Sequence, residues 1–183
     1  LSPSYVRYQK MNPERRKLCQ LLVQNNVTGG AMLMNHALVR LLVAHPMPEH
    51  AVMHDHWIAL VAATFGRIAY LDRALYDYRQ HTDNVLGARQ GSAIGEVKRR
   101  LGLSGESLAE MNAKSGAAYR ALFLQAAELE AQYGGELPAA AKKTLQDFLA
   151  LQQKNRLGKA VGILRGGFTF NLPHRTLGEL FFL

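Results

Sequence analysis

Hydrophobic residues recur every three or four positions in several stretches of the chain, which is the spacing of one face of a helix. One such stretch predicts a helix that begins at His54 and ends at Gly66, a usual helix stop. Its apolar positions are Ile58, Val61, Ala62 and Phe65. A shorter helix is predicted after Asn35, a good N-cap, and another from Pro13, which suits a first helical position.

The chain is predicted to be helical beyond about residue 92. Ser107 and Glu110 form a capping box at the start of a helix that continues to Tyr133, where a glycine pair ends it. Pro138 begins a further helix. Its apolar positions are Leu145, Phe148 and Leu149. We therefore expect a helical extension at residues 92–183.

Three stretches between these helices are predicted as strands. Residues 27–34 predict a buried strand, in which Gly29 and its neighbour Gly30 let another backbone or a ligand come close. Residues 67–71 and 74–79 are short segments rich in Tyr and Leu, typical of strands. The fold class expected is therefore α+β and mostly helical, with residues 1–91 as a mixed unit.

Composition narrows the class of protein. With 183 residues, 48 % hydrophobic and 20 % charged, the chain is long and apolar enough to enclose a core. It contains no apolar run of the ~18 residues that a membrane span requires. A single cysteine, Cys19, excludes a disulfide framework and fits a reducing compartment. Because the chain begins with Leu1 and has no signal-peptide opening, we expect it to be part of a longer polypeptide.

The net charge of +8 is spread along the chain. Residues 1–90 carry 10 basic and 6 acidic side chains, and residues 91–183 carry 12 and 8. The tightest basic clusters, residues 15–17 and 98–100, are only three residues long and predict solvated helix faces. No run of basic residues interleaved with aromatics marks a nucleic-acid surface, so no nucleic-acid partner is expected.

The sequence His54-Asp55-His56-Trp57 is the densest group of candidate functional residues. A carboxylate at the first turn of a helix is held ionised by the free N–H groups, so Asp55 is a candidate general base for a bound hydroxyl. The alternative is that Asp55 only caps the helix. Trp57 is similarly either a platform for a sugar ring or a core residue.

Histidines suggest a metal site as a separate hypothesis, since six of the seven lie in the first 81 residues. His50 and His54 are four residues apart, and His56 and His81 could complete a three- or four-ligand zinc site. The prolines before His54 oppose the helical geometry that such a pair needs. A further alternative is a metal-dependent phosphohydrolase, in which His54 and Asp55 would be the metal-binding pair on an all-helical bundle.

A polar loop follows the last predicted strand. Its residues Arg79, Gln80, His81 and Asn84 are donors suited to a diphosphate at the end of a strand. Taken in order, the motifs Asn-Val-Thr-Gly-Gly, His-Asp-x-Trp, Gly-Arg-Ile-Ala-Tyr-Leu-Asp and Tyr-Arg-Gln-His-x-x-Asn-x-x-Gly resemble family 2 glycosyltransferases, especially rhamnosyltransferase-like members that build bacterial surface polysaccharides. The resemblance covers residues 24–90, about a third of the chain.

The resemblance implies a GT-A fold of which this chain is the C-terminal half. In that family the N-terminal half binds the nucleotide-sugar and carries an Asp-x-Asp that holds Mg²⁺ or Mn²⁺. No Asp-x-Asp occurs in this sequence. We therefore expect residues 1–91 to be the acceptor and base half of the catalytic domain, inactive alone, and the nucleotide-binding half to precede Leu1.

The resemblance also implies a role for each candidate residue. Asp55 stands at the position of the family's base in a one-step inverting transfer to a hydroxyl of a saccharide or lipid-linked acceptor. Thr28, Gly29, His54 and Trp57 would form the acceptor site. Arg79, Gln80, His81 and Asn84 would bind the donor diphosphate, with His81 as a further metal ligand.

The sequence allows several roles for the helical extension. It could steady the catalytic half by docking on its core, or form a homodimer. Its basic, Phe-rich C-terminal tail could instead contact the cytoplasmic face of the membrane, which would make the protein cytoplasmic and peripheral. A further alternative is that residues 92–183 form a non-catalytic helical interaction module.

Overall fold

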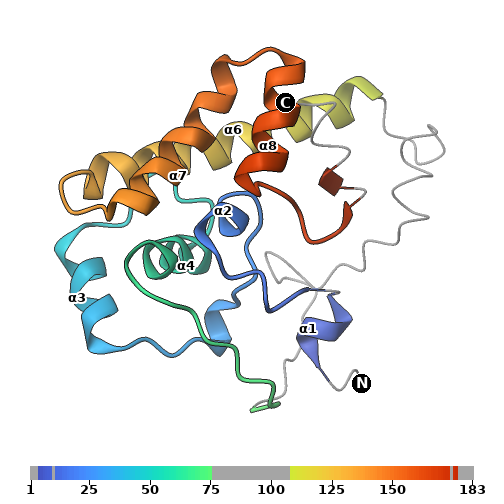
Figure 1. Cartoon of the computed structure of the whole chain (residues 1–183). Helices are drawn as coiled ribbons and strands as arrows, with labels where there is room; N and C mark the ends of the chain where they lie inside the picture. The colour runs from blue at the N-terminus through green and yellow to red at the C-terminus, as the bar shows by residue number, and fades with distance from the viewer. Residues whose placement is uncertain (1–3, 10, 76–107, 174, 177–183) are drawn as a thin grey trace.

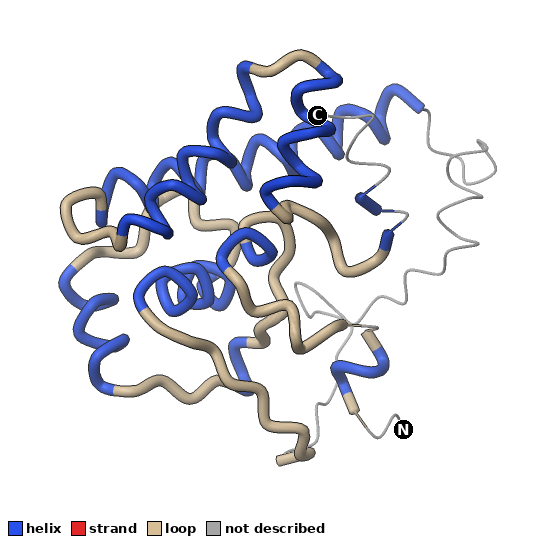
Figure 2. The backbone as a smooth tube through the Cα atoms, viewed as in Figure 1, coloured by secondary structure: helices blue, strands red, loops and turns tan. Residues whose placement is uncertain are grey.

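A computed structural model describes residues 4–9, 11–75, 108–173 and 175–176. This described part consists of helices joined by loops and contains no strand (Figures 1 and 2). The helices, in chain order, are α1 (Tyr5–Tyr8), α2 (Leu18–Leu21), η1 (Gly29–Ala31), α3 (His36–Ala44), α4 (His54–Phe65), α6 (Leu108–Tyr133), α7 (Ala139–Leu149), η2 (Ala150–Gln153) and α8 (Arg156–Gly166).

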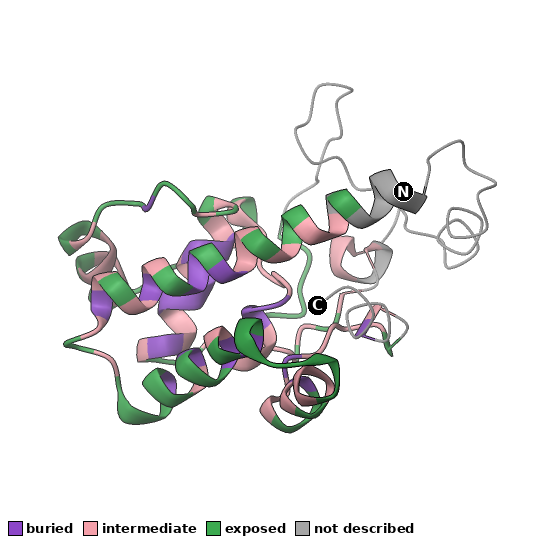
Figure 3. Ribbon diagram, turned by 90° about the horizontal axis from the view of Figure 1, so that it is seen from above, coloured by how far each residue is buried: buried purple, intermediate pink, exposed green. Residues whose placement is uncertain are grey.

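One hydrophobic core joins the first and last parts of the chain. Helix α7 lies along α6 and contacts α2 and α8, while α4 contacts α2, α3 and α6 (Figure 1). Buried positions gather where the helices meet, and exposed positions lie on their outer sides (Figure 3). The largest fully buried apolar side chains are Trp57, Tyr133, Phe148, Phe168, Leu21, Leu22, Leu60, Leu129, Leu145, Leu151 and Ile163. Helices from residues 108–166 thus dock on the core of α2 and α4.

The ends of several helices confirm the sequence predictions. Helix α4 begins at His54 and is closed by Gly66, whose N–H donates to the Ala62 carbonyl. The Asn35 side chain accepts a hydrogen bond from Leu38 N at 2.9 Å, as an N-cap does. Helix α6 ends at Tyr133. Pro138 precedes α7 as its N-cap. The predicted capping box at Ser107 lies outside the described residues.

The predicted strand at residues 27–34 is wrong. Gly29–Ala31 instead form the short helix η1, and Leu33 is fully exposed. The backbone at Thr28 and Met32 is extended. An extended segment becomes a strand only when a neighbouring strand pairs with its backbone groups, and the described part of the chain supplies none. Residues 67–71 likewise form a loop, and most of the predicted strand at 74–79 lies outside the described residues.

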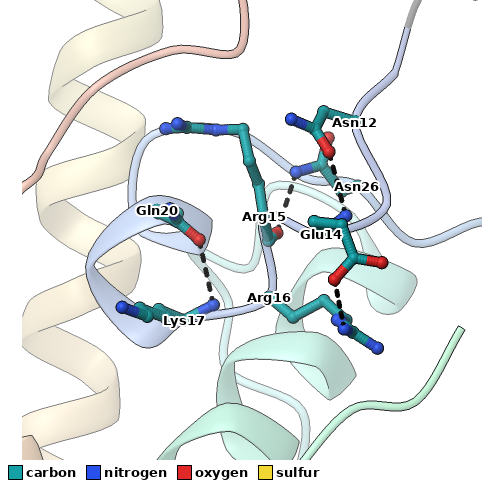
Figure 4. Close-up of polar contacts among 7 residues, drawn as sticks. All are labelled: Asn12, Glu14, Arg15, Arg16, Lys17, Gln20 and Asn26. Carbon is teal, nitrogen blue, oxygen red and sulfur yellow. Dashed lines mark hydrogen bonds and ion pairs between the residues drawn. The ribbon is translucent and has the colours of Figure 1, made fainter.

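The helix predicted from Pro13 is also wrong, because α2 begins only at Leu18. Polar side chains satisfy the backbone locally and favour turns over a helix (Figure 4). Asn12 Oδ1 accepts from Glu14 N at 3.0 Å. Gln20 Oε1 accepts from Lys17 N at 3.2 Å, and this bond caps the start of α2. Arg16 pairs with Glu14 at 2.6 Å. The basic cluster at 15–17 therefore does not form the expected helix face.

Arg15 connects three separate segments of the chain. Its carbonyl accepts a hydrogen bond from Asn26 Nδ2 at 3.0 Å (Figure 4). Its guanidinium donates to the Thr169 carbonyl and, at 3.0 Å, to Thr169 Oγ1. Nearby, Asn171 N donates to Gln24 Oε1 at 2.7 Å. These bonds hold the segment after α8 against the loop that leads to the candidate site.

Candidate functional site

The candidate site lies at the first turn of α4, where the Asp55 carboxylate is half-buried. Three N–H groups donate to it. Asn25 Nδ2 lies 3.0 Å and His56 N 2.7 Å from Oδ1, and Gly29 N lies 3.1 Å from Oδ2. Asp55 is the one acidic residue in the first turn of α4. Asp55 is therefore fixed in position by both its own helix and the preceding loop.

Asn25 shapes the loop that covers this helix end. While its Nδ2 donates to Asp55, its Oδ1 accepts from Val27 N at 2.9 Å. These bonds, together with that of Gly29 N to Asp55, hold the loop of residues 25–29 against the start of α4. Thr28 lies within this loop beside Gly29, at the start of η1.

The His54 ring lies directly against Gly29. A Cβ built on Gly29 would come within 2.5 Å of His54 Nε2 and 3.5 Å of Asp55 Cβ. His54 itself is exposed, at the first position of α4. The structure therefore brings Gly29, His54 and Asp55 together, although they are about 25 residues apart in the sequence.

This arrangement leaves the carboxylate able to accept one more hydrogen bond. An ionised carboxylate has about four acceptor positions, and three N–H groups occupy three of them. A hydroxyl that reaches Asp55 could donate to the remaining position. The oriented Asp55 carboxylate, next to the exposed His54 imidazole, could therefore accept a proton from such a hydroxyl.

Trp57 takes no part in this site, because its ring lies in the hydrophobic core with only 1 % exposed. It packs toward Tyr133, with ring centroids 6.4 Å apart. The Trp57 ring is not accessible to an acceptor sugar in this structure. Of the two roles expected for Trp57, sugar platform or core residue, the structure places it in the core.

His56 and Gln125 form a buried polar pair that the sequence analysis did not anticipate. His56 Nε2 donates to the Leu21 carbonyl at 2.6 Å, and Gln125 Nε2 donates to His56 Nδ1 at 3.3 Å. Gln125 Oε1 in turn accepts from Val52 N at 2.8 Å. Burial lowers the pKa of His56, while the bond to the Leu21 carbonyl and the Asp55 charge oppose that shift. The pair joins α2, α4 and α6 behind the candidate site.

The histidines predicted as zinc ligands do not come together in the described part of the chain. His50 pairs with Glu128 at 2.7 Å, while His56 is bonded to the Leu21 carbonyl. His81 lies outside the described residues. Among the residues that are described, no group of three His, Cys, Asp or Glu side chains could hold a metal ion. The zinc hypothesis therefore gains no support from these residues, and the phosphohydrolase alternative stays a prediction.

The predicted diphosphate-binding residues Arg79, Gln80, His81 and Asn84 also lie outside the described residues. Their role remains an expectation from the sequence.

Comparisons with family models, with curated proteins and with solved structures give no match for this chain. No helix within the described ranges is both long and apolar enough to cross a membrane.

Proposed function

We propose that this chain is the base-carrying half of an inverting glycosyltransferase. The donor is a nucleotide-diphosphate sugar, and the acceptor is a hydroxyl of a saccharide or lipid-linked saccharide, as in bacterial surface polysaccharide synthesis. The ordered motifs of residues 24–90 support this proposal. The observation that carries it is the Asp55 carboxylate, held by three N–H donors at the start of α4 with one acceptor position left.

In the proposed reaction Asp55 accepts the proton of the acceptor hydroxyl. The acceptor oxygen forms a bond to the anomeric carbon of the donor sugar as the bond from that carbon to the diphosphate breaks. The leaving diphosphate keeps the electron pair, and the configuration of the sugar is inverted. Asn25, Gly29 and His56 orient the carboxylate through their N–H groups, so little reorganisation is needed when the proton arrives.

His54 and Thr28 are proposed to border the acceptor, because His54 is exposed beside Asp55 and Thr28 adjoins Gly29. Arg79, Gln80, His81 and Asn84 are proposed to bind the donor diphosphate. Mg²⁺ or Mn²⁺ would neutralise that diphosphate in the complete enzyme.

The decisive experiment compares Asp55→Asn with Asp147→Asn in the complete polypeptide. Asp147 is an exposed carboxylate on α7, outside residues 24–90, and serves as the matched control. We expect Asp55→Asn to lower sugar transfer by about 10²-fold or more, because the amide cannot accept the proton. Asp147→Asn should leave transfer unchanged.

Thermal unfolding of both variants separates a catalytic loss from a folding defect. If Asp55→Asn is less stable, Asn25→Ala serves as a second variant, since it removes one N–H donor and leaves the carboxylate in place. It should then reduce transfer less than Asp55→Asn does. Near wild-type turnover of folded Asp55→Asn would remove Asp55 from the mechanism. Residues 1–183 alone should transfer no sugar.

A further inference from the structure

Helix α8 has an inner face built from small residues. Ile163 is fully buried, and Gly162 and Gly166 let α8 approach the segments beside it. A Cβ on Gly162 would lie 2.5 Å from Leu151 Cδ2, and one on Gly166 would overlap the Phe168 ring. Through this inner face α8 packs closely against the core.

The opposite face of α8 is also apolar, but it faces solvent. Leu157, Val161 and Leu164 are 75, 41 and 62 % exposed. At 100° per residue, positions i, i+4 and i+7 fall within about 60° of arc, so these side chains form one stripe along the helix. A surface helix normally has an apolar face toward the core and a polar face outward. The outer stripe of α8 is therefore not needed to fold this part of the chain.

Basic side chains flank this stripe. Arg156 and Arg165 are exposed on either side of it, and α8 contains no acidic residue. A hollow of about 800 Å³ between α7 and α8 adjoins the stripe and is lined by Lys143, Lys154 and Arg165. Its acidic lining residue, Asp147, is paired with Lys143 at 2.7 Å. Residues 148–183 as a whole carry five Lys or Arg and one acidic residue.

We propose that α8 docks on an anionic bilayer surface, with Leu157, Val161 and Leu164 in the apolar boundary and the flanking basic residues on the lipid headgroups. A membrane of this kind offers apolar depth and negative charge together, which matches both features of the face. A second copy of the chain fits less well, because a two-fold interface would bring the same basic residues against each other. The site is separate from Asp55 and does not depend on the proposed function.

The test measures co-sedimentation of the full chain with vesicles of phosphatidylcholine alone and of phosphatidylcholine mixed with phosphatidylglycerol. Binding is expected only to the mixed vesicles and should weaken with added salt. Arg156→Gln with Arg165→Gln should weaken it by about 30-fold, since each basic side chain near an anionic surface contributes about a factor of five. Leu157→Gln with Leu164→Gln should weaken it by about tenfold or more.

The matched controls are Arg40→Gln with Arg67→Gln, and Leu33→Gln with Leu71→Gln, which change exposed residues elsewhere and should leave vesicle binding unchanged. Light scattering of each variant gives its oligomeric state. The proposal is overturned if the wild-type chain ignores the mixed vesicles, if the controls weaken binding as much, or if the α8 substitutions change only self-association.

Discussion

Replacing His56 by Gln tests the buried polar pair between α4 and α6. Gln can keep the N–H that His56 donates to the Leu21 carbonyl, but it has no atom at the position of His56 Nδ1, which accepts from the Gln125 amide. A buried donor left without a partner costs about 1–3 kcal/mol. We expect the free energy of unfolding to fall by that amount above about pH 7, where the His56 ring is neutral. Urea unfolding, followed by circular dichroism, measures it.

The same substitution changes how stability depends on pH. Since burial lowers the pKa of folded His56, the unfolded chain binds more protons there just below about pH 6.5, the ordinary histidine value. The stability that neutral His56 provides is complete above that pH and is lost as the pH falls, by up to about 1.4 kcal/mol per pH unit. His56→Gln should remove this loss, and the exposed control His36→Asn should retain it. Equal slopes for wild type and His56→Gln between about pH 7 and about pH 5 would show that His56 does not cause this loss of stability.

Two further predictions concern packing and a helix cap. Leu145→Ala should lower the free energy of unfolding by about 2–5 kcal/mol, because Leu145 is fully buried. Leu124→Ala, on the outside of α6, should change it by about 0.5 kcal/mol or less. Similar losses for the two variants in urea unfolding would contradict the core described above. Asn155→Ala should cost about 1 kcal/mol, since Asn155 Oδ1 accepts from Gly158 N at 2.8 Å, and Asn155→Ser should recover most of it by calorimetry. A loss with Ser as large as with Ala would show that the cap is not the cause.

The helices that could be predicted from the sequence are those set by local signals. Asn35, Gly66 and Pro138 act through bonds and backbone angles within their own turn, and the helix ends they predict are present. The strand at 27–34 could not be predicted reliably, because a strand depends on a partner elsewhere. The helix predicted from Pro13 also fails to form. Contacts of Asn12 and nearby side chains favour turns there, although proline suits a first helical position.

The candidate site shows the same division. Asp55 at the first turn of α4 followed from local sequence, whereas its bonds to Asn25 and Gly29 depend on how a distant loop returns. A signal for Gln125 was present, since it lies three residues after Leu122 and four before Leu129 on the apolar face of α6. A polar residue on such a face needs a buried partner. Which residue supplies that partner, His56, is decided by tertiary packing alone.

The burial of Trp57 has a practical consequence for spectroscopy. It is the chain's single tryptophan, and its ring lies near Tyr133, so its fluorescence comes from the junction between α4 and the end of α6. Emission from this one indole reports directly on whether residues far apart in sequence remain assembled. If α6 and α7 detached before α4 unwound, the wavelength of that emission would move to the red while the helical circular dichroism signal persisted.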